Sequence, residues 1–178
     1  DLNLDDTELG VLQDGFSSIT IGGESISIEA LTFDGVDDHV VVGHDPSLNP
    51  GTGSLTLESR FKTTPTGQQQ ILVSKYGSGG LNGGPGGNES DHYRLEIVQD
   101  GRLRFAFRDA GGNEQELFSP LTYTDDVWHH VAAVRDVTAG RIKLYVDGTE
   151  VADVALTATG DIAPANDLTL GASEDFLA

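Results

Sequence analysis

The segment from Trp128 to Val151 constrains the fold more than any other part of this chain. Arg141 to Val146 alternates between polar and apolar side chains, and a period of two is what a half-buried antiparallel strand requires. We interpret His129 to Val134 as the preceding strand, with Gly140 taking a positive φ in the turn between them. Asp147-Gly148 is a strong signal for a two-residue hairpin into a third strand. A helix would need a period of 3.6 residues, which is absent, so the segment predicts a β-meander.

Short runs of the same kind recur along the rest of the chain, at the spacing of an all-β sandwich. Leu31 and Phe33 are expected to point into the core, and Asp109 to Glu116 is expected to be a turn. We therefore predict an all-β fold with two antiparallel sheets. The expected strand regions are residues 30–42, 54–62, 71–76, 92–108 (a hairpin around Asp100-Gly101), 117–123 and 168–170.

A set of ordered motifs resembles the laminin-G-like jelly rolls of the concanavalin A-like lectin/glucanase superfamily. The motifs are ALTFDGVDDHV at 30–40, SLTLE at 54–58, ILVSK at 71–75, YRLEI at 93–97, LRFAF at 103–107, WHHVA at 128–132, LYVDG at 144–148 and LTLGA at 168–172. The resemblance covers most of the chain and implies a concanavalin A-like jelly roll. Family members usually continue with a last strand beside the first, which is missing here, so we expect residues 16–21 or 24–28 to fill that edge.

Two regions are expected along the chain. Residues 1–28 are predicted to be an N-terminal extension or linker, with a possible short helix before residue 15 and a hairpin joined by Gly22-Gly23. Residues 2–22 resemble linker repeats of very large bacterial surface proteins. Residues 29–178 are predicted to form the jelly-roll domain. We therefore expect a monomeric module within a longer, adhesin-like chain.

Charge and composition restrict the partners. The formal net charge is −19, and this argues against nucleic acid or an anionic membrane surface as a partner. Bulk acidity also fits a plain solvated surface, as in proteins from saline habitats. Neither a long apolar run nor a cysteine occurs, which argues against membrane insertion and excludes disulfides. The composition is typical of bacterial extracellular or cell-surface material.

One turn is a candidate calcium site. Asp34, Asp37 and Asp38 crowd the segment after the first motif, and carboxylates at this density suit Ca²⁺. The resemblance implies a structural Ca²⁺ bound through the aspartate at position 38 and nearby backbone oxygens. The alternative is an aspartate-rich turn whose side chains cap backbone N–H groups.

The Gly-rich segment 77–91 is predicted to be a long surface loop, and such loops on β-sandwiches often carry binding. The alternative is an insertion with no role. Within and beside this loop we predict four ligand-binding residues: Tyr76, Asn88, Asp91 and His92.

A catalytic role is not expected. The paired carboxylates that glycoside hydrolysis needs on one strand are absent, and Glu114 and Glu116 are interpreted as solvated turn residues. One of His129 and His130 is expected to be packed and hydrogen-bonded, and Trp128 is expected in the core. We predict a non-catalytic extracellular module that binds a glycan or a cell-surface protein. The alternatives are a carbohydrate-binding domain appended to a glycoside hydrolase or lyase, and a purely structural calcium-stabilised spacer.

Overall fold

The computed structural model describes residues 18–21, 24–27, 30–35, 38–76 and 92–172, and only the backbone of the first two ranges. The predicted N-terminal helix and the residues Asp37, Asn88 and Asp91 lie outside these ranges. The chain divides into two compact units, residues 1–34 and 35–178. The boundary after residue 28 that we expected stays a prediction.

The N-terminal unit contains an antiparallel pair of strands, β1 (Ser18–Ile21) and β2 (Glu24–Ser27), with Ser18 opposite Ser27. The two runs expected before and after Gly22-Gly23 are thus antiparallel partners, and the turn itself lies outside the described residues. Residues 30–35 form no strand, and Leu31 is 65% exposed, as is Phe33 to a smaller extent. The inward orientation predicted for these two side chains is therefore wrong, because residues 30–35 do not form a strand.

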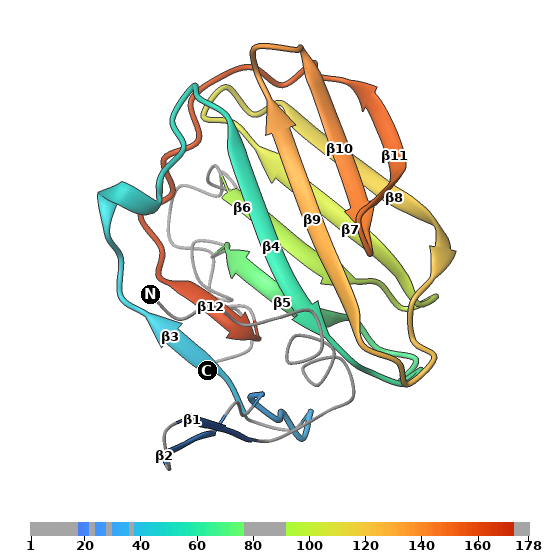
Figure 1. Ribbon diagram of the computed structural model, residues 1–178. Helices are drawn as coiled ribbons and strands as arrows, with labels where there is room; N and C mark the ends of the chain where they lie inside the picture. Colours follow the sequence, from blue (N-terminus) through green and yellow to red (C-terminus); the bar gives the residue numbers. More distant parts are fainter. Residues whose placement is uncertain (1–17, 22–23, 28–29, 36–37, 77–91, 173–178) are drawn as a thin grey trace. The chain divides into compact units, whose positions relative to one another are not determined.

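The second unit is a sandwich of two antiparallel sheets (Figure 1). The larger sheet has the order β3-β12-β5-β6-β7-β8, and the smaller has the order β11-β10-β9-β4. This confirms the predicted all-β jelly roll. The strands are β3 (Val40–Val42), β4 (Leu55–Phe61), β5 (Gln70–Lys75), β6 (His92–Ile97), β7 (Arg102–Arg108), β8 (Glu114–Thr122), β9 (His129–Asp136), β10 (Arg141–Val146), β11 (Thr149–Ala155) and β12 (Leu168–Gly171), and a 3₁₀ helix spans Pro46–Leu48.

The predicted meander is confirmed in β9, β10 and β11. Val131 lies opposite Val146, and Val146 lies opposite Thr149 across the tight turn. Asp147 and Gly148 have φ angles of 50° and 78°, so both central residues of the turn are left-handed. A two-residue turn of this kind twists in the same sense as its strands. Glycine has no steric penalty there, and aspartate tolerates the left-handed region better than most residues.

The core lies between the two sheets and is built by alternation along the strands. From the larger sheet it takes Tyr93, Leu95, Ile97 and the three large apolar residues of β7, and from the smaller sheet alternate residues of β9 and β10. The fully buried members include Leu95, Leu103, Phe105, Phe107, Val131, Ala133, Ile142 and Leu144.

The expectation that residues 16–21 or 24–28 fill the missing edge stays a prediction, because these residues belong to the other unit. Two other expectations are wrong. Glu114 and Glu116 belong to β8, since pairing with β7 extends that strand through the expected turn. Trp128 is 41% exposed because it precedes the first residue of β9, and its ring lies 5.9 Å from the Arg60 guanidinium carbon.

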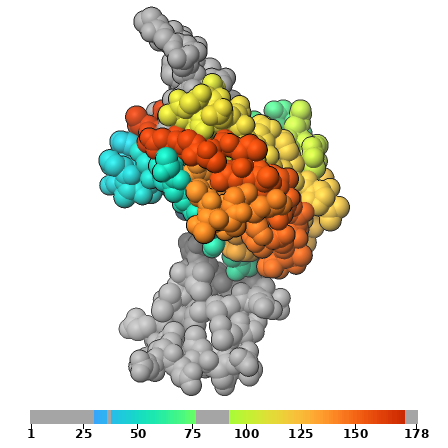
Figure 2. Space-filling view, turned by 90° about the horizontal axis from the view of Figure 1, so that it is seen from above, coloured from blue at the N-terminus to red at the C-terminus, as the bar shows by residue number. Residues whose placement is uncertain are grey.

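One end of the sandwich is held together by a buried arginine. Arg135 on β9 donates to the carbonyls of Gly53 at 2.6 Å and Gly160 at 3.0 Å, and makes longer contacts with those of Gly51 and Ala158. Figure 2 shows the joined segments as neighbours: the cyan residues near 50 lie against the orange-red residues that lead to β12. Burial lowers the pKa of Arg135, but the neighbouring Asp109 opposes that shift. Arg135 thus supplies an internal cation to loops from distant parts of the sequence.

Candidate ligand-binding surface

The outer face of the larger sheet holds a fully buried carboxylate, Glu96, beside several arginines. Along β6, Tyr93, Leu95 and Ile97 point to the core, so Arg94 and Glu96 point outward. The register places Glu96 opposite Arg104 on β7, and Arg104 opposite Phe118 on β8. We call this surface the arginine face, and define it as Tyr76, Arg94, Glu96, Arg102, Arg104, Glu116 and Phe118.

Basic residues are concentrated on this side of the sheet. The chain has ten lysines and arginines against 29 acidic residues. Four of the ten alternate along β6 and β7 on the outer side: Arg94, Arg102, Arg104 and Arg108. In a protein with a net charge of −19, such a concentration weakens the repulsion that an anion meets at this face.

Glu96 is the centre of the arginine face and is fully buried. Its carboxylate accepts hydrogen bonds from Arg104 Nε and from Gln69 Nε2, and Arg94 Nε lies 3.5 Å from its Oε1. Arg104 also uses Nη1 to reach Glu116 Oε1 at 3.2 Å. A buried carboxylate is tolerated only when paired in this way, so Glu96 fixes the position of two arginine side chains.

Aromatic rings support the guanidinium groups at both ends of the row. The guanidinium carbon of Arg94 lies 5.0 Å from the Tyr76 ring centre. Those of Arg102 and Arg104 lie 5.0 Å and 6.0 Å from the Phe118 ring centre. Such cation–π contacts hold the planar groups in place without using their N–H donors. Beside Arg102 and Phe118 is an open hollow of about 460 Å³, also lined by Val98, Gln99 and Asp100.

Two of the four predicted ligand-binding residues meet here. Tyr76 and His92 make an edge-to-face contact with ring centres 4.6 Å apart. His92 is buried, and Tyr76 is half-buried. The other two, Asn88 and Asp91, lie outside the described residues. The roles of all four stay predictions.

Sequence reasoning missed Arg94, Glu96 and Arg104. Their signal was present, because Arg94 and Glu96 alternate in HYRLEI, and Arg102, Arg104 and Arg108 alternate in RLRFAFR. A hairpin centred on Asp100-Gly101 then brings residues 96 and 104 opposite one another.

The predicted calcium site is not established. Asp34 and Asp38 are exposed, and Asp37 is outside the described residues. No group of three His, Cys, Asp or Glu side chains that could hold a metal occurs within the part of the chain that the structure describes. Calcium at Asp34, Asp37 and Asp38 therefore stays a prediction.

His129 confirms the expectation of one packed, hydrogen-bonded histidine. Its Nδ1 lies 2.8 Å from Asp147 Oδ2, its Nε2 lies 3.1 Å from Asp125 Oδ1, and the Tyr123 ring packs edge-on against it. Burial favours the neutral imidazole, but the hydrogen bonds to Asp147 and Asp125 outweigh it and raise the pKa of His129. Asp147 is the turn residue of the β10–β11 hairpin, so this histidine has a structural role.

Comparison with known proteins assigns the family. The chain belongs to the concanavalin A-like lectin/glucanases superfamily, whose Laminin_G_3 family matches residues 34–177. This confirms the resemblance carried by the motifs. No match was found among curated proteins. The described residues also contain no helix that is long and apolar enough to cross a membrane.

Three solved structures illustrate the similar fold. The binding domain of Paraclostridial Mosquitocidal Protein 1 has a TM-score of 0.58 at 13% identity, over 77% of this chain and 34% of that chain. Domains LG4-5 of the mouse laminin alpha1 chain give 0.56 at 22%, over 75% and 32%. The Ruminococcus gnavus IT-sialidase CBM40 bound to alpha2,3 sialyllactose gives 0.57 at 24%, over 74% and 68%. The chain spans about a third of the length of the first two.

Proposed function

We propose that this chain is a non-catalytic, extracellular binding module and that the arginine face is its ligand surface. The observation that carries the proposal is the row of guanidinium groups fixed by the buried Glu96 and by the rings of Tyr76 and Phe118. A row of this kind combines oriented donors with flat apolar surfaces. Glycan recognition needs both, because sugar hydroxyls accept hydrogen bonds and sugar C–H groups pack on aromatic rings.

The pairing of the carboxylates supports binding rather than catalysis. Glycoside hydrolysis needs a pair of carboxyl groups that flank the scissile bond of the sugar. Glu96 is buried and accepts bonds from Arg104 and Gln69, and Glu116 accepts a bond from Arg104. Both carboxylates are therefore engaged by side chains of the protein itself.

The similar folds support the ligand class. One of those structures is a domain bound to sialyllactose, and another is the binding domain of a mosquitocidal protein. Together with the linker-like residues 2–22, they favour a glycan-binding module in a large bacterial surface protein. In this proposal Asp34, Asp37 and Asp38 hold a structural Ca²⁺ that stiffens the turn.

A glycan array probed with the labelled wild-type protein, in buffer with and without calcium, tests the proposal. We expect retention on a defined set of glycans, and loss of that retention in Tyr76→Ala. The matched control is Tyr145→Ala, which removes a tyrosine that is hydrogen-bonded to Glu150 on the other sheet. Retention that is absent from every glycan and from cell-surface protein extracts would contradict a binding role and favour the spacer.

A further inference from the structure

We infer that the ligand of the arginine face is an acidic glycan, and that the Nη edge of Arg94 binds the carboxylate of one of its sugars. The inference rests on the proposed function and specifies its ligand. It follows from the different ways in which Arg94 and Arg104 use their donors.

Arg104 already uses its hydrogen-bond donors within the protein. Its Nε donates to Glu96 and its Nη1 donates to Glu116, and its opposite side faces Phe118. It therefore anchors the cluster.

Arg94 is held in place but keeps its donors. Its Nε faces Glu96 at 3.5 Å and its guanidinium lies over the Tyr76 ring. Neither Nη group makes a hydrogen bond with any residue that the structure describes. Its side chain is 16% exposed, so most of its flexibility is lost while part of the side chain remains accessible. A planar fork of this kind matches a carboxylate, with two parallel N–H···O bonds.

Charge favours a single carboxylate over a polyanion. The arginine face as defined holds three arginines and two glutamates, Glu96 and Glu116, so it carries one net positive charge. The chain as a whole carries −19 and repels long sulfated chains and nucleic acids. One sugar acid places one charge at the cluster and adds little repulsion elsewhere. The Tyr76 and Phe118 rings favour a sugar over an acidic peptide, because they offer flat surfaces to a pyranose ring.

The test is calorimetric titration of the full chain with matched probes. The first pair is 3′-sialyllactose and its methyl ester, in which a methyl group replaces the negative charge of the carboxylate. Lactose, an oligogalacturonate and a hexaglutamate peptide complete the set, so that sialic acid, uronic acid and acidic peptide are distinguished. We expect the free acid of sialyllactose or of the uronate to bind at least about tenfold more tightly than neutral probes, as expected for a lost charge-assisted hydrogen bond.

The variants are Arg94→Gln, Arg94→Lys and, as the matched control, Arg141→Gln on the other sheet. Arg94→Gln is expected to abolish the preference for the acid, Arg94→Lys to restore part of it, and Arg141→Gln to leave it unchanged. Equal binding of acid, ester and lactose would overturn the inference while the proposed function stands. Arg94-dependent binding of hexaglutamate but of no glycan would overturn the glycan assignment. Absence of binding to any probe would overturn the inference, and absence on the array as well would overturn the proposed function.

The comparison of free acid with methyl ester needs only the wild-type protein. It therefore remains decisive even if a variant is unstable.

Discussion

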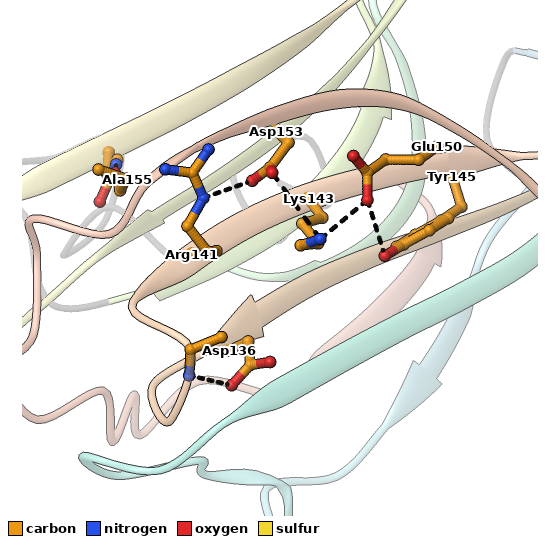
Figure 3. Close-up of polar contacts among 9 residues, drawn as sticks. Asp136, Arg141, Lys143, Tyr145, Glu150, Asp153 and Ala155 are labelled. Atoms are coloured by element: carbon orange, nitrogen blue, oxygen red, sulfur yellow. Dashed lines mark hydrogen bonds and ion pairs between the residues drawn. The ribbon is translucent and has the colours of Figure 1, made fainter.

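The outer faces of the two sheets contain the same kinds of charged residue in different arrangements. On the smaller sheet, Arg141 bonds Asp153 at 2.8 Å, and Lys143 and Tyr145 share Glu150 (Figure 3). Arg141, Lys143 and Tyr145 alternate along β10, and the paired side chains remain partly exposed. On the larger sheet the central carboxylate, Glu96, is fully buried between two arginines.

The difference shows which charge pairs indicate a binding site. Exposed pairs are screened by water and contribute little to stability, so the ladder of Figure 3 is explained by solubility and strand pairing. Burying Glu96 has a cost that only its pairing offsets. The arginine face adds aromatic rings under the guanidiniums and leaves the Arg94 fork without a bond to a described residue. It is this combination, and not charge alone, that makes the larger sheet the candidate surface.

The largest expected effect is on Glu96. In Glu96→Gln, two guanidinium groups lose their shared counter-charge inside the protein. We expect a loss of about 3–5 kcal/mol in the free energy of unfolding, the usual cost of breaking a buried pair. Urea unfolding followed by far-UV circular dichroism measures it. The matched change Glu150→Gln removes the equivalent acid from the smaller sheet and is expected to leave the midpoint nearly unchanged. Equal effects of the two changes would remove the basis of the comparison.

Calcium is expected to act away from both outer faces, because neither face gathers three possible metal ligands among the described residues. If the predicted ion binds at Asp34, Asp37 and Asp38, a concentration of 100 times Kd adds about 2.7 kcal/mol. The melting temperature should then rise by several degrees when calcium is added to protein from which a chelator has removed it. The shift should disappear in Asp38→Ala and persist in Asp136→Ala. An unchanged melting temperature would reject the calcium prediction and leave the arginine face unaffected.

A smaller, pH-dependent effect is expected on the side of the smaller sheet. The pKa of His129 is raised by Asp147 and Asp125 once burial has been outweighed. The stabilisation that His129 contributes is therefore complete below its unfolded pKa of about 6.5, and it is lost as pH rises through the pKa of the folded state. His129→Gln should lower the melting temperature at pH 6 by about 2–4 °C, the response of a domain this size to about 1 kcal/mol. The difference should shrink at alkaline pH; a difference that grew with pH would contradict the charged contact.

The smallest expected effect is that of salt. One molar salt shortens the screening length to about 3 Å and weakens exposed pairs more than buried ones. The small destabilisation caused by Glu150→Gln should vanish in 1 M sodium chloride, whereas that caused by Glu96→Gln should persist. Unfolding curves at two salt concentrations decide this. Equal salt dependence of both variants would show that Glu96 is solvated.

Much of the fold could be predicted because its information is local. The Asp147-Gly148 turn, the period of two in β10 and the hairpin around Asp100-Gly101 are each specified by neighbouring residues. The failure at Trp128 comes from the position of a strand end. Trp128 is an aromatic residue of the kind that usually lies in a core, yet its position just before β9 leaves it exposed.

The site was predictable in part. Alternation places Arg94 and Glu96 on one face, and the hairpin adds Arg104. The burial of Glu96 was not predictable, because it depends on Gln69, which another loop supplies. For the same reason the Arg135 contacts, made with four carbonyls of two loops, leave no local sequence signal.

The most direct test of the central claim is a nuclear magnetic resonance titration of ¹⁵N-labelled protein with 3′-sialyllactose. The side-chain Nε–H signals of Arg94 and Arg141 report on the two outer faces separately. The account predicts a saturable shift of the Arg94 signal and of backbone amides in β6 and β7, with the Arg141 signal unmoved. Shifts confined to Arg141, β10 and β11 would contradict it and place the ligand on the opposite sheet.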